Sequence, residues 1–268
     1  MTALDRMTRV YNNAMVRHRS RYYENSGFFN FGYWGGTAQT QSQASAALVD
    51  QLLDRIAVKG GRVLDVACGA GASTRRLMDS YAPDMIVGIN ISEVQLEAAR
   101  ALAPQCQFVR MDAARLEFAD SEFDAVICVE AAFHFKTREA FLREALRVLR
   151  PGGSLVLSDI LFRGMAGPLA SLFHVPQANR RAGLADYGSL LKASGFDAVR
   201  VEDATDVCLR PFLRRLMAWP LAQRKAGAST LAKAIRRSIG YAAVAGYFAA
   251  VCENYVLASA RKPDRGST

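Results

Sequence analysis

One stretch decides the fold of this 268-residue chain: Val63-Leu64-Asp65-Val66-Ala67-Cys68-Gly69-Ala70-Gly71. An apolar strand runs into a G-x-G turn, and a helical pattern follows at Ser73–Tyr81. Glycine lets the backbone turn tightly and approach a ligand closely. Nucleotide and phosphate sites share such a turn. Position 74 holds Thr where a dinucleotide-binding G-x-G-x-x-G turn has its third glycine, which argues against a dinucleotide ligand.

Helical and strand patterns alternate around this stretch. Helices are expected at 42–56, 73–81, 93–102, 137–149 and 186–194, and strands at 62–67, 85–91, 106–111, 123–129, 154–160, 198–203 and 255–260. Such alternation indicates a parallel sheet with right-handed crossovers. The sequence therefore predicts an α/β protein with a doubly wound, mostly parallel seven-stranded sheet, a helical N-terminal arm and helical lid insertions.

The same pattern divides the chain into parts. In chain order we expect an N-terminal arm or lid at 1–41, a ligand-binding core at 42–162, a lid insertion at 163–185, a core continuation at 186–208, a helical cap insertion at 209–247, and a last strand with a tail at 248–268. Both insertions follow strand ends. Ligands of open α/β sheets bind at the carboxyl ends of the strands, so both are expected to cover the site.

The net charge of +9 is spread unevenly along the chain. Residues 1–60 contribute +3, residues 61–162 contribute −3, and residues 163–268 contribute +9. The core is therefore mildly acidic, and the positive charge belongs to the arm and lids. A nucleic acid, an anionic membrane surface and an anionic substrate would each fit a basic flank.

Cysteine usage and hydropathy indicate the compartment. The five cysteines are scattered and form no C-x-x-C pair, as in proteins of a reducing cytosol. The N-terminus lacks the apolar core of a signal peptide. The longest apolar run, Tyr241–Cys252, has 12 residues, whereas a spanning helix needs about 20. The sequence predicts a soluble, cytoplasmic protein and leaves a homodimer open.

The stretch from Asp65 to Gly71 resembles motif I of the class I S-adenosylmethionine (SAM)-dependent methyltransferases. Four further segments resemble motifs of that family in the same order and spacing. They are Val87–Ser92 at the ribose, Arg110–Ala113 at the adenine, Phe123–Glu130 in the fourth strand, and Leu149–Leu155 at the turn into the fifth strand. The resemblance spans roughly residues 40–205. It implies a Rossmann-like fold, S-adenosyl-L-methionine as cofactor and S-adenosyl-L-homocysteine as product.

The resemblance also implies individual cofactor contacts. Positions implied to contact SAM through the main chain are Gly69, Gly71 and Ala113, and Ala67 and Ile91 are further implied cofactor-binding positions. Asp65 would orient the loop or reach the amino group of SAM through water. Asp112 would accept a hydrogen bond from the adenine amine.

The ribose position departs from the general family pattern. Most members place an acidic residue there, but this chain has Asn90 and, five residues later, Gln95. Amide oxygens can accept the same hydroxyl protons without charge. The pair resembles a subset that includes cyclopropane-forming lipid enzymes and natural-product tailoring methyltransferases. The alternative is that both residues are only polar groups of a turn and a helix surface.

Upstream, Asn30–Trp34 resembles the aromatic segment that closes over SAM in that subset. The Tyr33 hydroxyl would reach the SAM carboxylate. The Trp34 ring would pack near the sulfonium in a cation–π contact. The alternative is a hydrophobic staple that fixes the N-terminal helix to the sheet.

The candidate catalytic residues follow the fourth strand. Methyl transfer is an in-line displacement, and an alcohol or phenol acceptor must also lose a proton. A neutral imidazole suits that task at pH 7. His134 is therefore the candidate general base, and Glu130 would orient it or contact SAM. The alternatives are that His134 braces the SAM pocket or packs between neighbouring phenylalanines, and that Glu130 caps a helix or loop.

The acceptor is predicted from the lids. They are rich in Leu, Phe, Met and Ala and contain Trp219, which favours a small apolar or aromatic acceptor. We expect O-methylation of a secondary metabolite. C- or N-methylation of an isoprenoid, lipid or alkaloid-like acceptor stays open. A nucleic-acid-binding SAM protein is disfavoured because no RNA-binding module is present, and no metal is expected because no ligand-spaced His and carboxylates occur.

Overall fold

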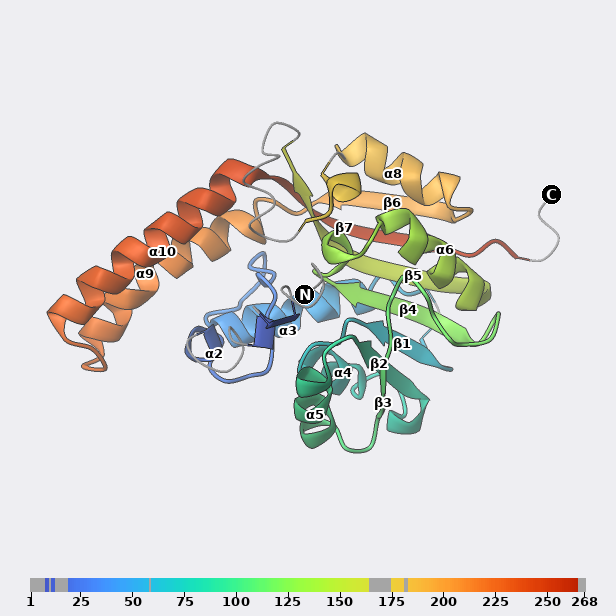
Figure 1. Ribbon diagram of the computed structural model, residues 1–268, viewed down its shortest axis with the longest axis horizontal. Helices are drawn as coiled ribbons and strands as arrows, with labels where there is room; N and C mark the ends of the chain where they lie inside the picture. The colour runs from blue at the N-terminus through green and yellow to red at the C-terminus, as the bar shows by residue number, and fades with distance from the viewer. Residues whose placement is uncertain are drawn as a thin grey trace.

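The computed structural model describes residues 8–9, 11–12, 19–57, 59–163, 175–180 and 183–264. They form a seven-stranded sheet in the order β3-β2-β1-β4-β5-β7-β6 (Figure 1). The strands are β1 (Val63–Val66), β2 (Ile86–Asn90), β3 (Gln107–Arg110), β4 (Phe123–Val129), β5 (Leu149–Phe162), β6 (Asp197–Asp203) and β7 (Cys252–Arg261). β7 runs antiparallel to β5 and β6, and the other neighbours are parallel. The predicted Rossmann-like sheet is confirmed.

Helices cover both faces of the sheet (Figure 1). The α-helices of the described residues are α2 (Arg19–Tyr22), α3 (Gln41–Leu53), α4 (Ala72–Leu77), α5 (Glu93–Leu102), α6 (Arg138–Val148), α8 (Leu184–Ala193), α9 (Leu209–Lys225) and α10 (Leu231–Val251). Successive strand residues belong to opposite layers: Val63 packs into the cluster that holds Leu48 of α3, and Leu64 into the cluster that holds Phe141 of α6. This alternation buries the central strands on both sides, so they read as almost unbroken apolar runs.

Polar caps start the helices that flank the ligand loops. The Ser92 hydroxyl accepts a hydrogen bond from the Gln95 amide at the start of α5, and Thr137 does the same for Ala140 at the start of α6. A side-chain oxygen at this position satisfies a backbone amide that the helix leaves unpaired. The two caps fix where the chain leaves β2 and where it enters α6.

The strand order places two loops beside each other. β1 pairs with β2 on one side and with β4 on the other, so the chain winds outward in both directions from β1 and β4. The loops after these two strands therefore leave the same edge of the sheet. This is the position where ligands of doubly wound sheets bind.

Some elements differ in length from the expected ones. β5 extends to Phe162 because β7 pairs with it from Ser154 to Phe162. The expected 209–247 cap is a hairpin of α9 and α10 that continues to Val251 and extends away from the body (Figure 1). Residues 164–174 and 181–182 of the expected lid, and much of the arm before residue 19, lie outside the described residues.

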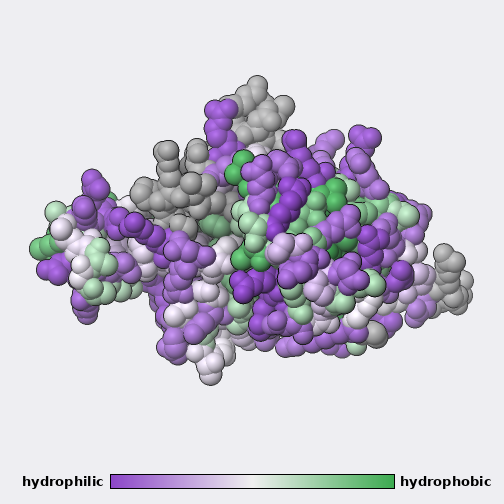
Figure 2. All heavy atoms as spheres, turned by 90° about the horizontal axis from the view of Figure 1, so that it is seen from below, coloured by the Kyte–Doolittle hydropathy of each residue, from purple (hydrophilic) through white to green (hydrophobic). Residues whose placement is uncertain are grey.

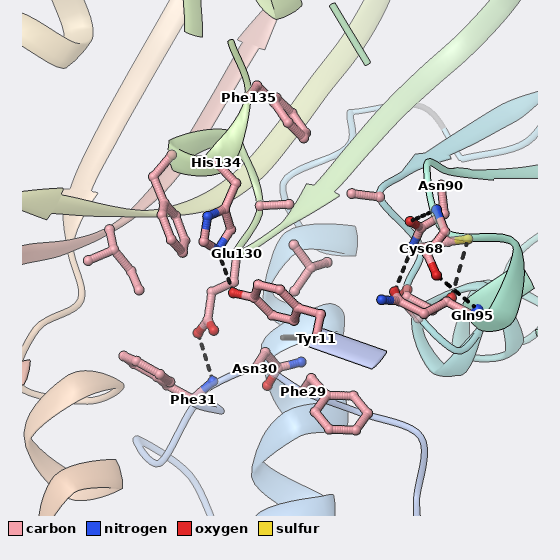
Figure 3. A pocket seen from close by; sticks show the side chains of 18 of the residues that line it. Tyr11, Phe29, Asn30, Phe31, Cys68, Asn90, Gln95, Glu130, His134 and Phe135 are labelled. Atoms are coloured by element: carbon pink, nitrogen blue, oxygen red, sulfur yellow. Dashed lines mark hydrogen bonds between the residues drawn. The ribbon is translucent and has the colours of Figure 1, made fainter. Parts of the chain in front are cut away.

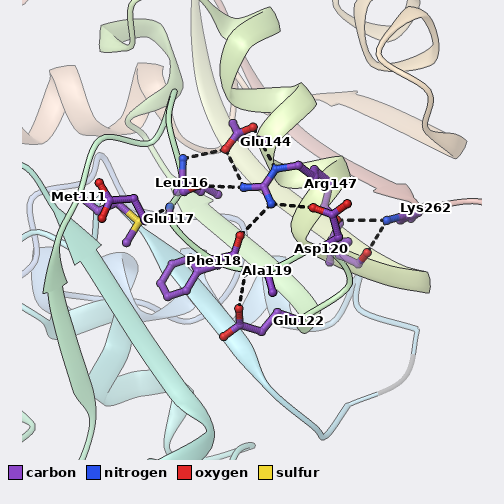
Figure 4. A network of polar contacts seen from close by, with 11 residues as sticks. Met111, Leu116, Glu117, Phe118, Ala119, Asp120, Glu122, Glu144, Arg147 and Lys262 are labelled. Atoms are coloured by element: carbon purple, nitrogen blue, oxygen red, sulfur yellow. Dashed lines mark hydrogen bonds and ion pairs between the residues drawn. The ribbon is translucent and has the colours of Figure 1, made fainter.

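A polar network holds the loop between β3 and β4 against α6 (Figure 4). The Arg147 guanidinium donates to the carbonyls of Leu116 and Phe118, each at 2.8 Å. It also pairs with Asp120 at 2.8 Å and with Glu144 at 2.9 Å. These contacts fix the segment that follows Asp112 and Ala113, the residues expected at the adenine.

Candidate active site

The turn after β1 is open toward a cavity. Ala67 and Gly69 line the cavity and have left-handed backbones, with φ of +58° and +57°. A Cβ added at Gly69 would meet no atom within 4 Å, so the bare main chain faces open space. Gly71 does not line the cavity. A Cβ there would lie 2.8 Å from the Cα of Ala99, so this glycine lets α4 approach α5.

Asp65 lies below this turn and not in the cavity wall. One of its carboxylate oxygens accepts hydrogen bonds from the hydroxyls of Ser73 and Thr74, each at 2.7 Å. The other oxygen, Oδ1, has no hydrogen-bond partner among the described residues. Burial raises the pKa of Asp65 to about 6. The carboxylate ties the end of β1 to the first turn of α4 and so shapes the loop.

The residues expected at the ribose lie together. Nδ2 of Asn90 donates to Oε1 of Gln95 at 2.9 Å, and Oδ1 of Asn90 accepts from the amide of Ser92 at 3.0 Å. Asn12 of the N-terminal arm reaches the same group: its Oδ1 lies 2.8 Å from the Ser92 hydroxyl and 3.4 Å from Nε2 of Gln95. Both amides line the cavity, as does Ile91.

Asp112 and Ala113 form the cavity wall at the end of β3. Oδ1 of Asp112 accepts a hydrogen bond from the amide of Ala114 at 2.9 Å, which closes a local turn. The Arg147 network holds the segment that directly follows this turn. No described residue hydrogen-bonds to the second carboxylate oxygen of Asp112, so this oxygen is available for a donor on a ligand.

The cavity has a volume of about 970 Å³ and two differently lined parts. One part is formed by the polar and main-chain groups just described. The other is largely aromatic and apolar, and its lining residues include Tyr22, Phe133, Phe162, Phe212, Leu216, Tyr241, Val244 and Phe248. A cavity of this size can hold a nucleoside-sized cofactor together with a second small molecule.

His134 lies between the two parts, on the turn after β4 (Figure 3). The hydroxyl of Tyr11, from the N-terminal arm, makes a hydrogen bond with its Nε2. The two rings meet edge-on, with centroids 5.1 Å apart. Phe133 packs against the imidazole at a centroid distance of 4.0 Å. The imidazole is half-buried, and its Nε2 faces the Tyr11 hydroxyl inside the cavity.

Glu130 begins this turn with a left-handed backbone, φ +49°. Such a conformation is strained for a residue other than glycine and is frequent at functional sites. Its Oε1 accepts from the Phe31 amide at 2.7 Å (Figure 3) and from the Tyr255 hydroxyl at 2.7 Å. Burial raises the pKa of Glu130 to about 8, although both donors oppose the shift. The carboxyl group is therefore mostly protonated at neutral pH.

A buried network holds the turn that carries His134. Asp159 on β5 accepts from the Phe133 amide at 3.1 Å, and Nδ2 of Asn179 donates to the carbonyls of Phe133 and Phe135. Arg138 pairs with Asp159 at 2.6 Å, and both side chains are almost fully buried. The backbone on both sides of His134 is thus tied to β5 and to the 3-10 turn at Gln177–Asn179.

Tyr33 and Trp34 do not line the cavity, contrary to expectation. The chain turns away at Gly32, whose φ is +80° and where a Cβ would lie 2.7 Å from Ala44. The Trp34 ring faces the Arg215 guanidinium, 4.0 Å from the ring centroid. The aromatic residues that do reach the cavity come just before this turn: Phe28, Phe29 and Phe31.

Of the expected site residues, the fold brings nine to the cavity wall: Ala67, Gly69, Asn90, Ile91, Gln95, Asp112, Ala113, Glu130 and His134. Sequence reasoning missed Tyr11 and Asn12. They lie 123 and 80 residues from their partners His134 and Ser92. No local pattern marks them, because only the folded chain brings these two residues next to their partners.

Comparison with known proteins agrees with this geometry. Residues 64–157 match a family described as a methyltransferase domain. The 27-O-demethylrifamycin SV methyltransferase of Amycolatopsis mediterranei is 32% identical over 250 residues, which cover 87% of this chain and 89% of that one. The chain belongs to the SAM-dependent methyltransferases. It is therefore an enzyme, and its cofactor is SAM.

Solved structures of this methyltransferase fold align along nearly the whole chain. The [4+2]-cyclase SpnF superposes with a TM-score of 0.69 at 24% identity and covers 96% of both chains. The SAM complex of Haemonchus contortus phosphoethanolamine N-methyltransferase 2 gives a TM-score of 0.69 at 18% identity, over 95% of this chain and 60% of that one. At these identities the likeness concerns the fold.

Proposed function

We propose that this methyltransferase acts on a hydroxyl oxygen of a small apolar or aromatic natural product, with His134 as the general base. The contact between the Tyr11 hydroxyl and Nε2 of His134 carries the proposal. In this contact a hydroxyl group of the cavity lies within hydrogen-bonding distance of the imidazole nitrogen, which supports the proposal. An acceptor hydroxyl that gives its proton to Nε2 takes the place of the Tyr11 hydroxyl there.

The cofactor half of the cavity fits SAM. The open main chain at Gly69 suits the methionyl end, the Asn90–Gln95 pair suits two ribose hydroxyls, and Asp112 suits the adenine amine. We assign SAM contacts to Ala67, Gly69, Asn90, Ile91, Gln95, Asp112 and Ala113. When bound, SAM supplies an electrophilic methyl group and leaves as S-adenosyl-L-homocysteine.

The chain's own residues then have three tasks. The aromatic half of the cavity binds the acceptor and excludes water, which helps to align the acceptor oxygen for in-line attack. His134 removes the hydroxyl proton at Nε2 as the oxygen attacks the methyl carbon. General-base assistance of this kind contributes about 10²–10⁴-fold to the rate. Asp159 and Asn179 hold the His134 turn in position.

The side chains that line the aromatic half of the cavity indicate which class of acceptor it binds. Phe133, Phe212 and Phe248 contribute aromatic surface to the cavity wall. The acceptor is therefore expected to be apolar and larger than a small amine such as phosphoethanolamine. The similarity to an enzyme named for 27-O-demethylrifamycin SV, whose name indicates transfer to oxygen, supports a polyketide-like hydroxyl. A carbon acceptor is the second candidate. Glu130 beside these rings would stabilise a cationic intermediate once its carboxyl group ionises.

An acceptor panel tests the proposal. The enzyme is incubated with SAM and, in turn, 27-O-demethylrifamycin SV, geranyl diphosphate and phosphoethanolamine, which offer oxygen, carbon and nitrogen. Mass spectrometry locates the added methyl group. We expect methylation at oxygen of the polyketide. Exclusive methylation of geranyl diphosphate carbon would favour the second candidate, and exclusive methylation of phosphoethanolamine would overturn the acceptor class.

A further inference from the structure

The α9–α10 hairpin displays apolar side chains to solvent. Among the described residues, seven large apolar side chains are exposed, and five of them lie on these two helices. They are Met217 (41% exposed), Leu221 (51%), Leu231 (58%), Ile235 (51%) and Ile239 (69%). Leu231, Ile235 and Ile239 are one helical turn apart and so follow one face of α10. The outer end of the hairpin, at the left of Figure 2, carries such side chains among strongly hydrophilic ones.

The same hairpin is strongly basic. Residues 209–251 contain eight Lys and Arg and no Asp or Glu, so they contribute +8 to the net charge of +9. Arg214, Met217, Leu221 and Arg224 follow one another at intervals of three or four residues on α9. Two apolar side chains therefore lie between two cationic ones along one helix face. Helices that lie at the boundary between lipid headgroups and acyl chains have this composition.

A lipid surface fits this hairpin better than a second copy of the chain does. If two copies met through their hairpins, two segments that each carry a net charge of +8 would face each other. Their electrostatic repulsion opposes association. An anionic bilayer attracts these charges and also accepts the apolar side chains. Within the described residues no helix is both long and apolar enough to cross a membrane, so contact would be with the surface only.

We propose that the α9–α10 hairpin docks the enzyme on an anionic lipid surface. The inner parts of both helices wall the aromatic half of the cavity, through Phe212 and Leu216 of α9 and Phe248 of α10. The docked face is therefore continuous with the helices that bind the acceptor, and a membrane-dissolved apolar acceptor would be concentrated there. The docking goes beyond the proposed O-methylation and does not depend on His134.

Co-sedimentation with lipid vesicles tests the electrostatic part. The probes are vesicles of phosphatidylcholine alone and of an equal mixture of phosphatidylcholine and phosphatidylglycerol. We expect the protein to pellet with the mixed vesicles only, and less so as salt rises. Arg214→Glu with Arg224→Glu should lower the apparent affinity at least ~10-fold. Lys192→Glu with Arg200→Glu, on α8 and β6, makes the same charge change and should have little effect.

A second pair of variants tests the apolar part. Ile235→Gln with Ile239→Gln should weaken vesicle binding, whereas Met85→Gln with Val94→Gln, exposed apolar residues elsewhere, should not. Calorimetric binding of S-adenosylhomocysteine verifies that every variant is folded. The proposal is overturned if mixed vesicles bind no protein at low salt, or if the control pairs lose as much binding. It is also overturned if light scattering finds a dimer that the Ile235/Ile239 variant dissociates while vesicle binding persists.

Discussion

The Tyr11 hydroxyl hydrogen-bonds to Nε2 of His134, a residue 123 positions further along the chain. The next residue, Asn12, reaches Ser92 and Gln95 beside the expected ribose site. Two adjacent arm residues therefore contact both the candidate base and the cofactor half of the cavity. The positions of these two residues therefore link the cofactor half of the cavity to the access of an acceptor to His134.

Removal of the Tyr11 hydroxyl should favour the acceptor. In Tyr11→Phe the ring remains, but the hydroxyl no longer competes for Nε2 of His134. We expect the KM for the acceptor to fall about two- to tenfold with kcat nearly unchanged, measured by steady-state kinetics at saturating SAM. A loss of kcat by ~10²-fold would instead make Tyr11 part of the proton-transfer chemistry.

Gln95→Ala should weaken the cofactor site. Its Oε1 accepts from Asn90, and loss of this contact frees the Asn90 amide from its fixed orientation. We expect the dissociation constant of S-adenosylhomocysteine, measured by calorimetry, to rise about tenfold, which corresponds to ~1.4 kcal/mol. Glu97→Ala, on an exposed position of α5, is the matched control. An unaltered constant for Gln95→Ala would remove this residue from the site.

Glu130 should make folding stability depend on pH. Its pKa rises from 4.5 to about 8 on folding, so the folded state binds an extra proton between these values. This contribution is fully present below pH 4.5 and is lost as pH rises through about 8. Glu130→Gln keeps the acceptor oxygen for Tyr255 and Phe31 and cannot titrate.

Urea unfolding of both proteins at pH 5 and pH 9 measures the effect. Relative to the Gln variant, the wild type should lose on the order of a few kcal/mol of unfolding free energy at the higher pH. Asp65 titrates in both proteins, so its contribution cancels. The same difference between the two proteins at both pH values would contradict the assignment.

The buried ion pair below His134 should matter more than surface pairs. Arg138→Ala leaves Asp159 buried without its partner, and such changes cost about 3–5 kcal/mol of unfolding free energy. Arg76→Ala, which breaks exposed pairs with Asp50 and Asp79, should cost about 0–1 kcal/mol. Chemical denaturation compares the two variants. Equal losses would mean that the Arg138–Asp159 pair is no more important than a surface contact.

Much of the fold could be predicted because local patterns determine it. The apolar runs of β1 and β4 and the turn at Gly69 are visible in sequence. The resemblance to a methyltransferase subset implied that Asn90 and Gln95 act together, and the two side chains are hydrogen-bonded in the structure.

Other parts depend on tertiary structure that no local pattern records. Gly32 directs Tyr33 and Trp34 away from the cavity because it must fit against Ala44, a contact that appears only when the arm packs on α3. Tyr11 meets His134 for the same kind of reason. The antiparallel contact with β7 extends β5 two residues beyond the expected end at residue 160.

The most direct test of the proposed mechanism is the turnover of His134→Ala. The variant is assayed with the acceptor that the panel identifies, at saturating SAM, with the SAM dissociation constant measured in parallel. We predict that kcat falls by ~10²-fold or more while SAM affinity stays within a few-fold. An unchanged kcat would contradict the assignment of His134 as the general base.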